Sequence, residues 1–207
     1  IAFFGAPTVF GDHAARACAA ALQMKQAEVL LNELIKEQQL SKYLLQTRIG
    51  INTGDMVVGN MGTARKMDYT IMGNAVNLAA RLEGVNKRYG TWNLISDTTF
   101  AAAGADFVTR RLDRVRVVGI NTPVQLYELV GKQGQLDETM LSCLQIFEDG
   151  LQASEQRDWK QAVKAFGEVL AIKPDDGPAS YYLERCRGFE KKPPQDGWDG
   201  VFNLTEK

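Results

Sequence analysis

Two polar side chains in one short segment have the types and the spacing to bind a phosphate group. Residues 69–81 read YTIMGNAVNLAAR: a short extended run ends at Gly73, and a helical pattern that carries Asn77 and Arg81 follows. Residues four apart on a helix project from the same face. Because the arginine guanidinium is a planar fork of donors that suits phosphoryl oxygens, this face predicts a phosphate-binding helix.

The sequence around Arg81 leaves its charge without a local partner. The positions three and four residues away from it hold Asn77, Leu78, Gly84 and Val85. None of these is a carboxylate, so no side chain of the same helix can pair with the guanidinium. Gly73 supplies backbone freedom where the helix begins, and Asn74 is expected to cap the first turn. The partner of Arg81 is therefore either a structural carboxylate on another element, the usual case for a helical arginine, or a ligand phosphate.

The same helix belongs to a series of motifs within the first 131 residues. The motif stretches are 1–7, 12–14, 48–62, 68–81, 82–86, 89–90, 95–96 and 112–116. Together they resemble the catalytic domain of the class III adenylate and guanylate cyclases, most closely the bacterial type of adenylate cyclase. Many separately placed residues carry this resemblance, which makes it far more specific than a lone glycine-rich loop.

The resemblance implies a reaction and gives the two helix side chains roles in it. Adenylate cyclases of this family convert ATP to 3′,5′-cyclic AMP and pyrophosphate, the ribose 3′ hydroxyl attacking its own α-phosphate. By this resemblance Asn77 orients the ribose, and Arg81 stabilises the charge that grows on the α-phosphate. Little covalent work falls to the protein, so positioning and charge neutralisation must supply most of the rate.

Thr70 occupies the position at which the family reads the nucleotide base. Many animal cyclases carry aspartate there, whereas threonine accompanies ATP use in the bacterial type that the sequence resembles. A hydroxyl both donates and accepts, so Thr70 can meet the adenine amino group or a ring nitrogen. The resemblance therefore favours ATP over GTP. The structural alternative is a strand-end hydroxyl that bonds to backbone.

The resemblance also implies two metal ions and a second copy of the chain. Family members bind two Mg²⁺ or Mn²⁺ ions through two aspartates, one expected shortly before Ile1 and the other much earlier. A base-reading lysine is expected upstream as well. Asp55 and Asp68 do not occupy the metal positions, so no metal ligand is assigned to this chain. Because the family's sites lie between two catalytic domains, a homodimer with two equivalent sites is expected.

Val118 departs from the family pattern. The family usually has a lysine at this position, within residues 117–120, to contact the terminal phosphates. In an extended strand Arg116 faces the same side as residue 118, about 7 Å earlier along the chain, so we expect Arg116 to take over the pyrophosphate contact. The departure leaves a second interpretation open, a catalytically weak or silent cyclase-like module that binds nucleotide or mediates dimerisation.

Composition places further limits on function. The chain has 207 residues, 45% of them hydrophobic and 24% charged, and its net charge of −1 gives no sign of nucleic-acid binding. No apolar run reaches the roughly 20 residues of a membrane span, so no direct membrane contact is expected from this chain. Three widely spaced cysteines, Cys18, Cys143 and Cys186, indicate reduced thiols in a cytoplasmic compartment. An upstream sensor domain is compatible with these features.

Patterns along residues 1–131, the cyclase-like domain, predict the elements that position these side chains. Strands are expected at 1–4, 44–52, 56–58, 92–95, 107–118 and 124–130, and helices at 12–37, 74–87 and 97–103. The turn residues at 53–55 predict a hairpin between 44–52 and 56–58. Strands interleaved with helices in this order indicate an α+β fold. The resemblance likewise implies a ferredoxin-like cyclase sandwich, an antiparallel-rich sheet with helices on one face.

The pattern becomes purely helical after a composition break at 131–134. Residues 135–192, the helical arm, contain spacings that resemble one tetratricopeptide repeat and the start of a second. The residues that carry this likeness are Gly150, Trp159, Ala162, Phe166 and Pro174. So few repeats cannot bury their own apolar faces, so the arm is expected to dock on the cyclase-like domain, on a second copy or on a partner peptide that it recruits. The tail, residues 193–207, is expected to fold back over apolar surface.

Overall fold

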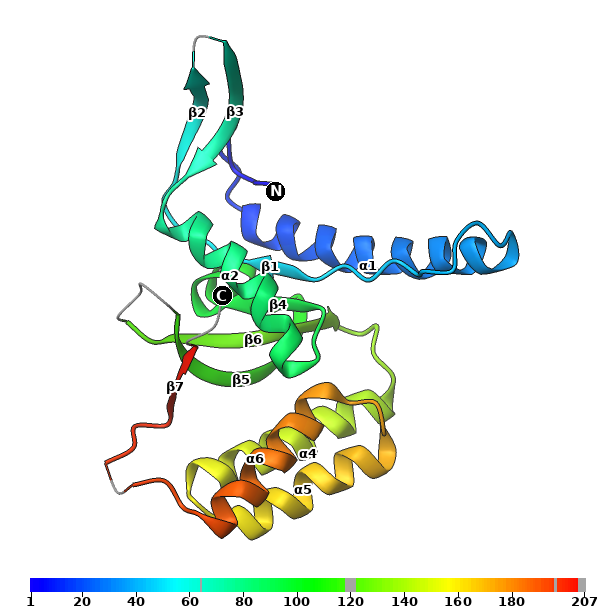
Figure 1. Ribbon diagram of the computed structural model, residues 1–207, viewed down its shortest axis with the longest axis vertical. Coiled ribbons are helices and arrows are strands. Elements are labelled where there is room, and N and C mark those ends of the chain that lie inside the picture. The colour runs from blue at the N-terminus through cyan, green and yellow to red at the C-terminus, as the bar shows by residue number, and fades with distance from the viewer. Residues whose placement is uncertain (64, 118–121, 196, 205–207) are drawn as a thin grey trace.

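A five-stranded mixed sheet forms the centre of the molecule in the computed structural model, which describes residues 1–63, 65–117, 122–195 and 197–204 (Figure 1). The sheet has the order β1-β4-β6-β5-β7, and its strands are β1 (Ile49–Ile51), β4 (Asn93–Ser96), β5 (Phe107–Val117), β6 (Val124–Lys132) and β7 (Val201–Leu204). A separate hairpin consists of β2 (Val57–Thr63) and β3 (Lys66–Met72). The helices are α1 (His13–Glu37), α2 (Asn74–Tyr89), α3 (Asp97–Ala103), α4 (Glu138–Glu155), α5 (Trp159–Ile172) and α6 (Gly177–Lys191). The predicted α+β fold class is confirmed.

Helices cover both faces of this sheet. In β4, which is buried at every position, Leu94 belongs to the core that α2 and the helical arm share, and Ile95 belongs to the core beneath α1. Successive side chains of a strand point to opposite faces. In β1, correspondingly, Gly50 faces α2, whereas Ile49 and Ile51 pack with α1. The expectation of helices on one face was wrong, because a strand buried at every position needs cover on both sides.

The pairing of the N-terminal strands differs from the predicted hairpin. β1 pairs in parallel with β4, which lies much later in the chain. β2 pairs with β3, starting with Val57 opposite Met72, and this hairpin projects from the body of the molecule (Figure 1). The predicted hairpin between 44–52 and 56–58 was wrong, because the turn residues at 53–55 lead out of the sheet into the projecting hairpin.

The predicted strand at residues 1–4 does not form in the described structure. Ile1 is fully exposed, and the described sheet has no strand beside these residues. A strand needs a neighbour for its backbone N–H and C=O groups, and residues 1–4 lack one. The helical patterns predicted the positions of helices more accurately than the extended runs predicted strands. α1 and α2 confirm the helices expected at 12–37 and 74–87, and α3 covers the expected residues 97–103.

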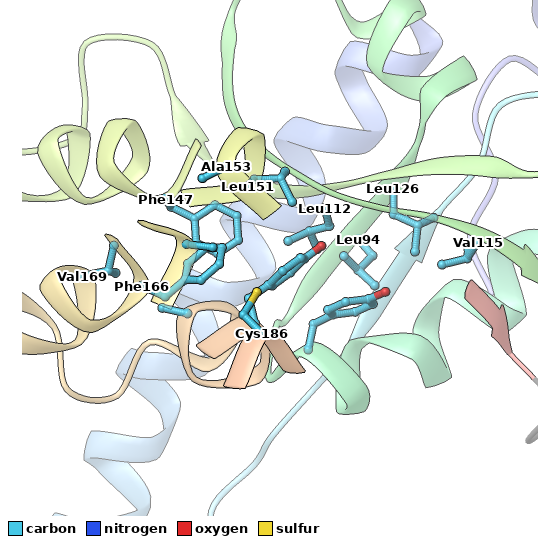
Figure 2. Close-up of a cluster of buried hydrophobic side chains, with 14 of the residues drawn as sticks. Leu94, Leu112, Val115, Leu126, Phe147, Leu151, Ala153, Phe166, Val169 and Cys186 are labelled. Atoms are coloured by element: carbon cyan, nitrogen blue, oxygen red, sulfur yellow. The ribbon is translucent and has the colours of Figure 1, made fainter. Parts of the chain in front are cut away.

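The helical arm docks on the cyclase-like domain. Its helices α4, α5 and α6 lie together on one side of the sheet (Figure 1). Gly150 lets α4 approach α5 closely, because a Cβ there would come 2.9 Å from the ring of Phe166. Figure 2 shows Phe147 and Phe166 of the arm in one buried cluster with Leu112 and Leu126 of the sheet. The arm and the sheet therefore share a core, whereas the relation of the arm to tetratricopeptide repeats stays a prediction.

A buried ion network joins the arm to the sheet. Arg110 of β5 donates from Nη1 to Asp176 at 2.7 Å and from Nε to Glu128 of β6 at 2.8 Å. Asp176 also caps α6, because its carboxylate accepts from the backbone N–H of Ala179 at 2.9 Å. Burial raises the pKa of Glu128, although Arg110 favours its charged form. One arginine thus pairs with two carboxylates that come from different parts of the fold.

The tail returns to the sheet and adds strand β7. β7 pairs in parallel with β5, and Val201 lies opposite Arg114. Trp198 packs in a T-shaped arrangement against Phe189 of α6 and against Phe202 of β7, with 5.3 Å between ring centroids in each pair. The tail therefore connects the arm and the sheet a second time.

The three cysteines are free and buried, as predicted for reduced thiols in the core. Burial raises the pKa of Cys18 to about 11, so this thiol stays protonated at neutral pH. Among the helices that the structure describes, none combines the length and the hydrophobicity needed to cross a bilayer.

Candidate active site

Helix α2 carries the two polar side chains singled out in the sequence. It begins directly after the projecting hairpin, at Gly73, whose φ of 150° lies in the region that favours glycine. Its buried residues Leu78, Leu82 and Tyr89 pack into the shared core and hold the helix on the sheet. Gly73 is the N-cap residue, and no side chain caps this end of α2, so the expected cap by Asn74 was wrong.

Close contacts fix α2 against β1. A Cβ at Gly50 would come 2.4 Å from the carbonyl oxygen of Ala79, so only glycine fits beneath this part of α2. Asn86 is fully buried, and its side-chain amide donates to the carbonyl oxygens of Ile49 and Leu82, each at 3.0 Å. Asn86 was not among the predicted site residues. The signal for it is its position four residues after Leu82, on the apolar stripe of the helix.

Asn77 and Arg81 lie one helical turn apart on α2, as predicted. Asn77 is exposed, whereas Arg81 is half-buried. The Nη1 atom of Arg81 is buried and has no hydrogen-bond partner among the described residues. A buried charged donor without an acceptor is unfavourable, and native structures contain few of them. The prediction that Arg81 lacks a partner on its own helix is confirmed, and its guanidinium is suited to an anionic ligand.

Thr70 lies on β3, opposite Gly59 of β2, and is half-buried. Its hydroxyl makes no hydrogen bond within the part of the chain that the structure describes, so the alternative of bonding to backbone is not observed. β3 leads through Gly73 directly into α2, and one continuous segment therefore places Thr70 relative to the polar face of α2. No described contact joins Thr70 to Asn77.

Arg116 lies on β5 and is held by the tail. Its Nη2 atom donates to Oδ2 of Asp199 at 2.8 Å. Its neighbour Val115 is fully buried in the core beneath α2, so by strand alternation Arg116 points away from that core. No described contact joins Arg116 to the polar side chains of α2, and the structure brings only Asn77 and Arg81 together. Val118 lies outside the described residues.

The described residues do not form a metal site. No group of three or more histidine, cysteine, aspartate or glutamate side chains among them lies close enough together to hold an ion. On the hairpin, the side chain of Asp68 is exposed, and its Oδ2 atom lies 3.9 Å from the Nζ atom of Lys66. The residues that the structure describes thus supply no donor set for the two Mg²⁺ or Mn²⁺ ions that the resemblance implies.

Comparison with known sequences relates the chain to enzymes that make cyclic nucleotides. Residues 1–131 match the family described as the adenylate and guanylate cyclase catalytic domain. The chain is 33% identical over 146 residues to the terminal-differentiation-specific adenylate cyclase of Dictyostelium discoideum, and 37% identical over 130 residues to adenylate cyclase 1 of Rhizobium meliloti. These matches cover 69% and 63% of this chain but 7% and 19% of the two relatives. The chain therefore corresponds to a small part of each relative.

Solved structures show the same relationship. The adenylyl cyclase CyaB from P. aeruginosa matches with a TM-score of 0.56 at 33% identity, over 65% of this chain and 68% of that one. The guanylyl cyclase Cya2 matches with a TM-score of 0.54 at 34% identity, over 65% of this chain and 66% of that one. Because the family match spans residues 1–131, more than half of the chain, the chain belongs over those residues to the family of adenylate and guanylate cyclase catalytic domains.

Proposed function

We propose that the chain is the catalytic domain of an adenylate cyclase, which converts ATP to 3′,5′-cyclic AMP and pyrophosphate. The observation that carries this proposal is the state of Arg81. Its Nη1 atom is buried and has no hydrogen-bond partner among the described residues, and the side chain lies on the same face of α2 as Asn77. Two similar proteins and one similar structure are named adenylate or adenylyl cyclases. Family membership supports the reaction class, and α2 supplies the residues that would act.

In the proposed reaction the ribose 3′ oxygen attacks the α-phosphorus of the same nucleotide, and the bond from that phosphorus to pyrophosphate breaks. Arg81 donates to the α-phosphoryl oxygens, where negative charge grows, and Asn77 orients the ribose. Donors fixed in a partly buried site act in a lower effective dielectric than water, which strengthens them. Holding the reacting atoms in line supplies a further large share of the rate.

Thr70 is proposed to contact the base and to favour ATP. A threonine hydroxyl can serve the adenine amino group or a ring nitrogen, and the hydroxyl of Thr70 has no other partner among the described residues. The structural neighbours include one adenylyl and one guanylyl cyclase at similar identity, so the assignment of ATP rests on Thr70 and on the sequence relatives.

A second copy and metal ions complete the proposed enzyme. The described residues offer no metal cluster, so two Mg²⁺ or Mn²⁺ ions would take their ligands from outside these residues. The proposed form is a cytoplasmic homodimer with two equivalent sites, each between the two copies, and an upstream sensor domain would control its turnover.

Product formation tests the proposal. The protein that contains this chain is incubated with ATP or GTP and Mn²⁺, and cyclic AMP and cyclic GMP are quantified beside the variant Asn77→Ala. We expect more cyclic AMP than cyclic GMP, and we expect the substitution to lower kcat by about 10- to 100-fold because the ribose loses its orientation. Cyclic GMP as the main product would overturn the choice of substrate. A folded dimer that forms neither product would overturn the enzyme assignment.

One observation favours a second candidate function, a silent module that binds nucleotide or dimerises without turnover. Arg116, which we expect to replace the family's phosphate-binding lysine, is engaged by Asp199. A pyrophosphate group would have to displace this carboxylate. The two side chains are 36% and 50% exposed, so the ion pair is weak enough to exchange.

The variant Arg116→Ala tests this point. If Arg116 leaves Asp199 for the pyrophosphate, we expect its loss to raise KM for ATP by about 10-fold, because a charged hydrogen bond to phosphate contributes to binding. Asp199→Asn is the matched control, since it frees the guanidinium without removing it, and its KM should be equal to or below that of the parent. Steady-state kinetics with varied ATP measure both. An unchanged KM in Arg116→Ala would remove this residue from the proposed site.

A further inference from the structure

Helix α6 of the arm contacts the C-terminal end of α2, the helix that carries Asn77 and Arg81. Gly90, whose φ of 68° ends α2, lies against Gly177 at the start of α6. A Cβ at Gly177 would come 2.7 Å from the carbonyl oxygens of Tyr89 and of Gly90. The two glycines therefore let the backbones of the helices touch, with no side chain between them.

A buried carboxylate ties the same two helices to the sheet. Asp113 of β5 is 5% exposed and accepts from the hydroxyl of Tyr89 at 2.7 Å and from the hydroxyl of Tyr182 on α6 at 2.8 Å. Arg185 of α6 donates to both oxygens of Asp113, at 2.6 and 2.9 Å. These four donors use the acceptor capacity of one carboxylate. We call these residues the Asp113 cluster: Asp113, Tyr89, Tyr182 and Arg185. The cluster links β5, α2 and α6.

The last turn of α2 makes three further contacts with α6. Arg88 donates from Nε to the hydroxyl of Tyr181 at 2.9 Å. The ring of Tyr89 packs T-shaped on Tyr181 with 5.0 Å between centroids, and stacks on Tyr182 at 6.3 Å. Aromatic pairs of this kind add to the free energy of burial and restrict the orientation of both rings. The C-terminal end of α2 is therefore held in position and in rotation.

The opposite end of α2 has no such cluster, although the side-chain amide of Asn52 donates to the carbonyl oxygen of Ala75 in the first turn at 3.0 Å. It continues into the hairpin β2–β3, which projects from the body of the molecule, and no side chain caps its first turn (Figure 1). A packed helix transmits a shift along its axis, or a rotation about it, to every side chain it carries. Asn77 and Arg81 precede Tyr89 by 12 and 8 residues, or about 18 and 12 Å along the axis. The contacts with α6 therefore act, together with the close contacts between α2 and β1, on where these two side chains lie.

We propose that α6 positions the catalytic face of α2. Through Gly177 and the Asp113 cluster, the arm acts together with β1 to set the axial position and the rotation of α2, and with them the placement of Asn77 and Arg81 at the nucleotide. This inference rests on the proposed function, because the two side chains act on a nucleotide only if the chain is a cyclase. Gly177 and Tyr182 are positioning residues, which act through α2 without touching the substrate.

Two alanine substitutions on α6 form a matched test. A Cβ at Gly188 meets no atom within 4 Å, so Gly188→Ala is expected to keep kcat and the thermal midpoint of the parent. Gly177→Ala adds the same methyl group against the end of α2 and pushes the two helices apart. With ATP and Mn²⁺ we expect it to lower kcat by about 10-fold and to change KM by less than about 3-fold, because a small misplacement weakens the reacting geometry most.

Two further measurements distinguish positioning from a general loss of structure. Tyr182→Phe removes one hydrogen-bond donor from Asp113 without adding bulk, and it should lower kcat as Gly177→Ala does. In an Arg81→Lys background, Gly177→Ala should lower kcat by a smaller factor than it does in the parent. A general loss of folded protein would lower kcat by the same factor in both backgrounds. Hydrogen exchange over residues 74–89 should be faster in Gly177→Ala and unchanged in Gly188→Ala.

Failure of this inference differs from failure of the proposed function. Unchanged kcat together with unchanged exchange over residues 74–89 in Gly177→Ala would overturn the inference in an active enzyme. If neither the parent nor any variant forms a cyclic nucleotide, the proposed function fails. Exchange over residues 74–89 then decides alone: faster exchange in Gly177→Ala supports the control of α2 by α6, and unchanged exchange overturns it.

Discussion

Arg81→Ala is expected to lower kcat for cyclic AMP formation by about 100- to 1,000-fold, the range typical of removing one donor to a developing oxyanion. The Nη1 atom of Arg81 is buried and has no acceptor among the described residues. A buried donor is left in this state when its acceptor belongs to a ligand. Asn77, one turn earlier, is uncharged and cannot replace the guanidinium. Steady-state kinetics with ATP and Mn²⁺ measure the effect.

Thermal unfolding separates this loss from misfolding. Arg81→Ala removes a buried donor without a partner, so we expect the midpoint to stay unchanged or to rise. Arg81→Lys is the control, because it keeps the charge but loses the planar fork, and it should restore only part of kcat. A kcat for Arg81→Ala within about threefold of the parent, less than 1 kcal/mol of barrier, would contradict the role assigned to Arg81.

Arg110→Met is expected to lower the free energy of unfolding by about 3–5 kcal/mol, the range for breaking a buried ion pair from one side. The side chain of Arg110 is 3% exposed, and those of its partners Glu128 and Asp176 are 14% and 0% exposed. Methionine keeps much of the volume but removes the nearest cation from two carboxylates that lie close together, and it leaves Asp176 with the more distant Nζ atom of Lys173, at 3.8 Å. Urea titration at pH 8 measures the loss.

The loss in Arg110→Met should depend on pH. The pKa of Glu128 is already raised by burial, and removing Arg110 raises it further because the charged form loses its cation. Between the ordinary glutamate pKa and this higher folded-state pKa, the folded protein binds more protons than the unfolded chain. The stability of the variant therefore falls as pH rises through this window, and we expect a smaller loss at pH 5 than at pH 8.

Arg111→Met is the matched control for this prediction. Arg111 joins Glu148 and Glu155 of α4 at 2.8 and 2.5 Å, but the three side chains are 27%, 32% and 53% exposed. Solvent screens such pairs, so we expect this variant to lose less than about 1 kcal/mol. Equal losses in the two variants would show that burial is not what makes the Arg110 network important.

Short-range patterns predicted most elements of the fold, and long-range pairing escaped them. α3 begins after Ser96, whose side chain accepts from the backbone N–H of Thr99, and such a cap is visible in the sequence. β1 pairs instead with a distant strand, Ile49 opposite Asn93, which no local pattern indicates. The turn residues at 53–55 fit any chain reversal, and the predicted hairpin therefore joined them to the nearest extended run.

The same limit applies to the site. Asn77 and Arg81 were predicted because spacing on one helix is a local property, and the sequence alone excluded a partner on that helix. Their dependence on the arm was not predictable. Asp113 lies in an alternating strand, where a carboxylate usually faces solvent, and its donors Tyr89 and Tyr182 come from helices far apart in the chain. Only the folded chain brings these groups together.

Strand β7 also has a consequence for association between molecules. The outermost strand of a sheet offers a row of free N–H and C=O groups, on which another chain can add a strand and begin an aggregate. Residues 201–204 occupy that row along residues 114–117 with the protein's own backbone. β7 has only four residues, so the new outer strand is itself a poor template. The tail thus covers the outer edge of β5 along residues 114–117 and makes that stretch unavailable to a strand of another molecule.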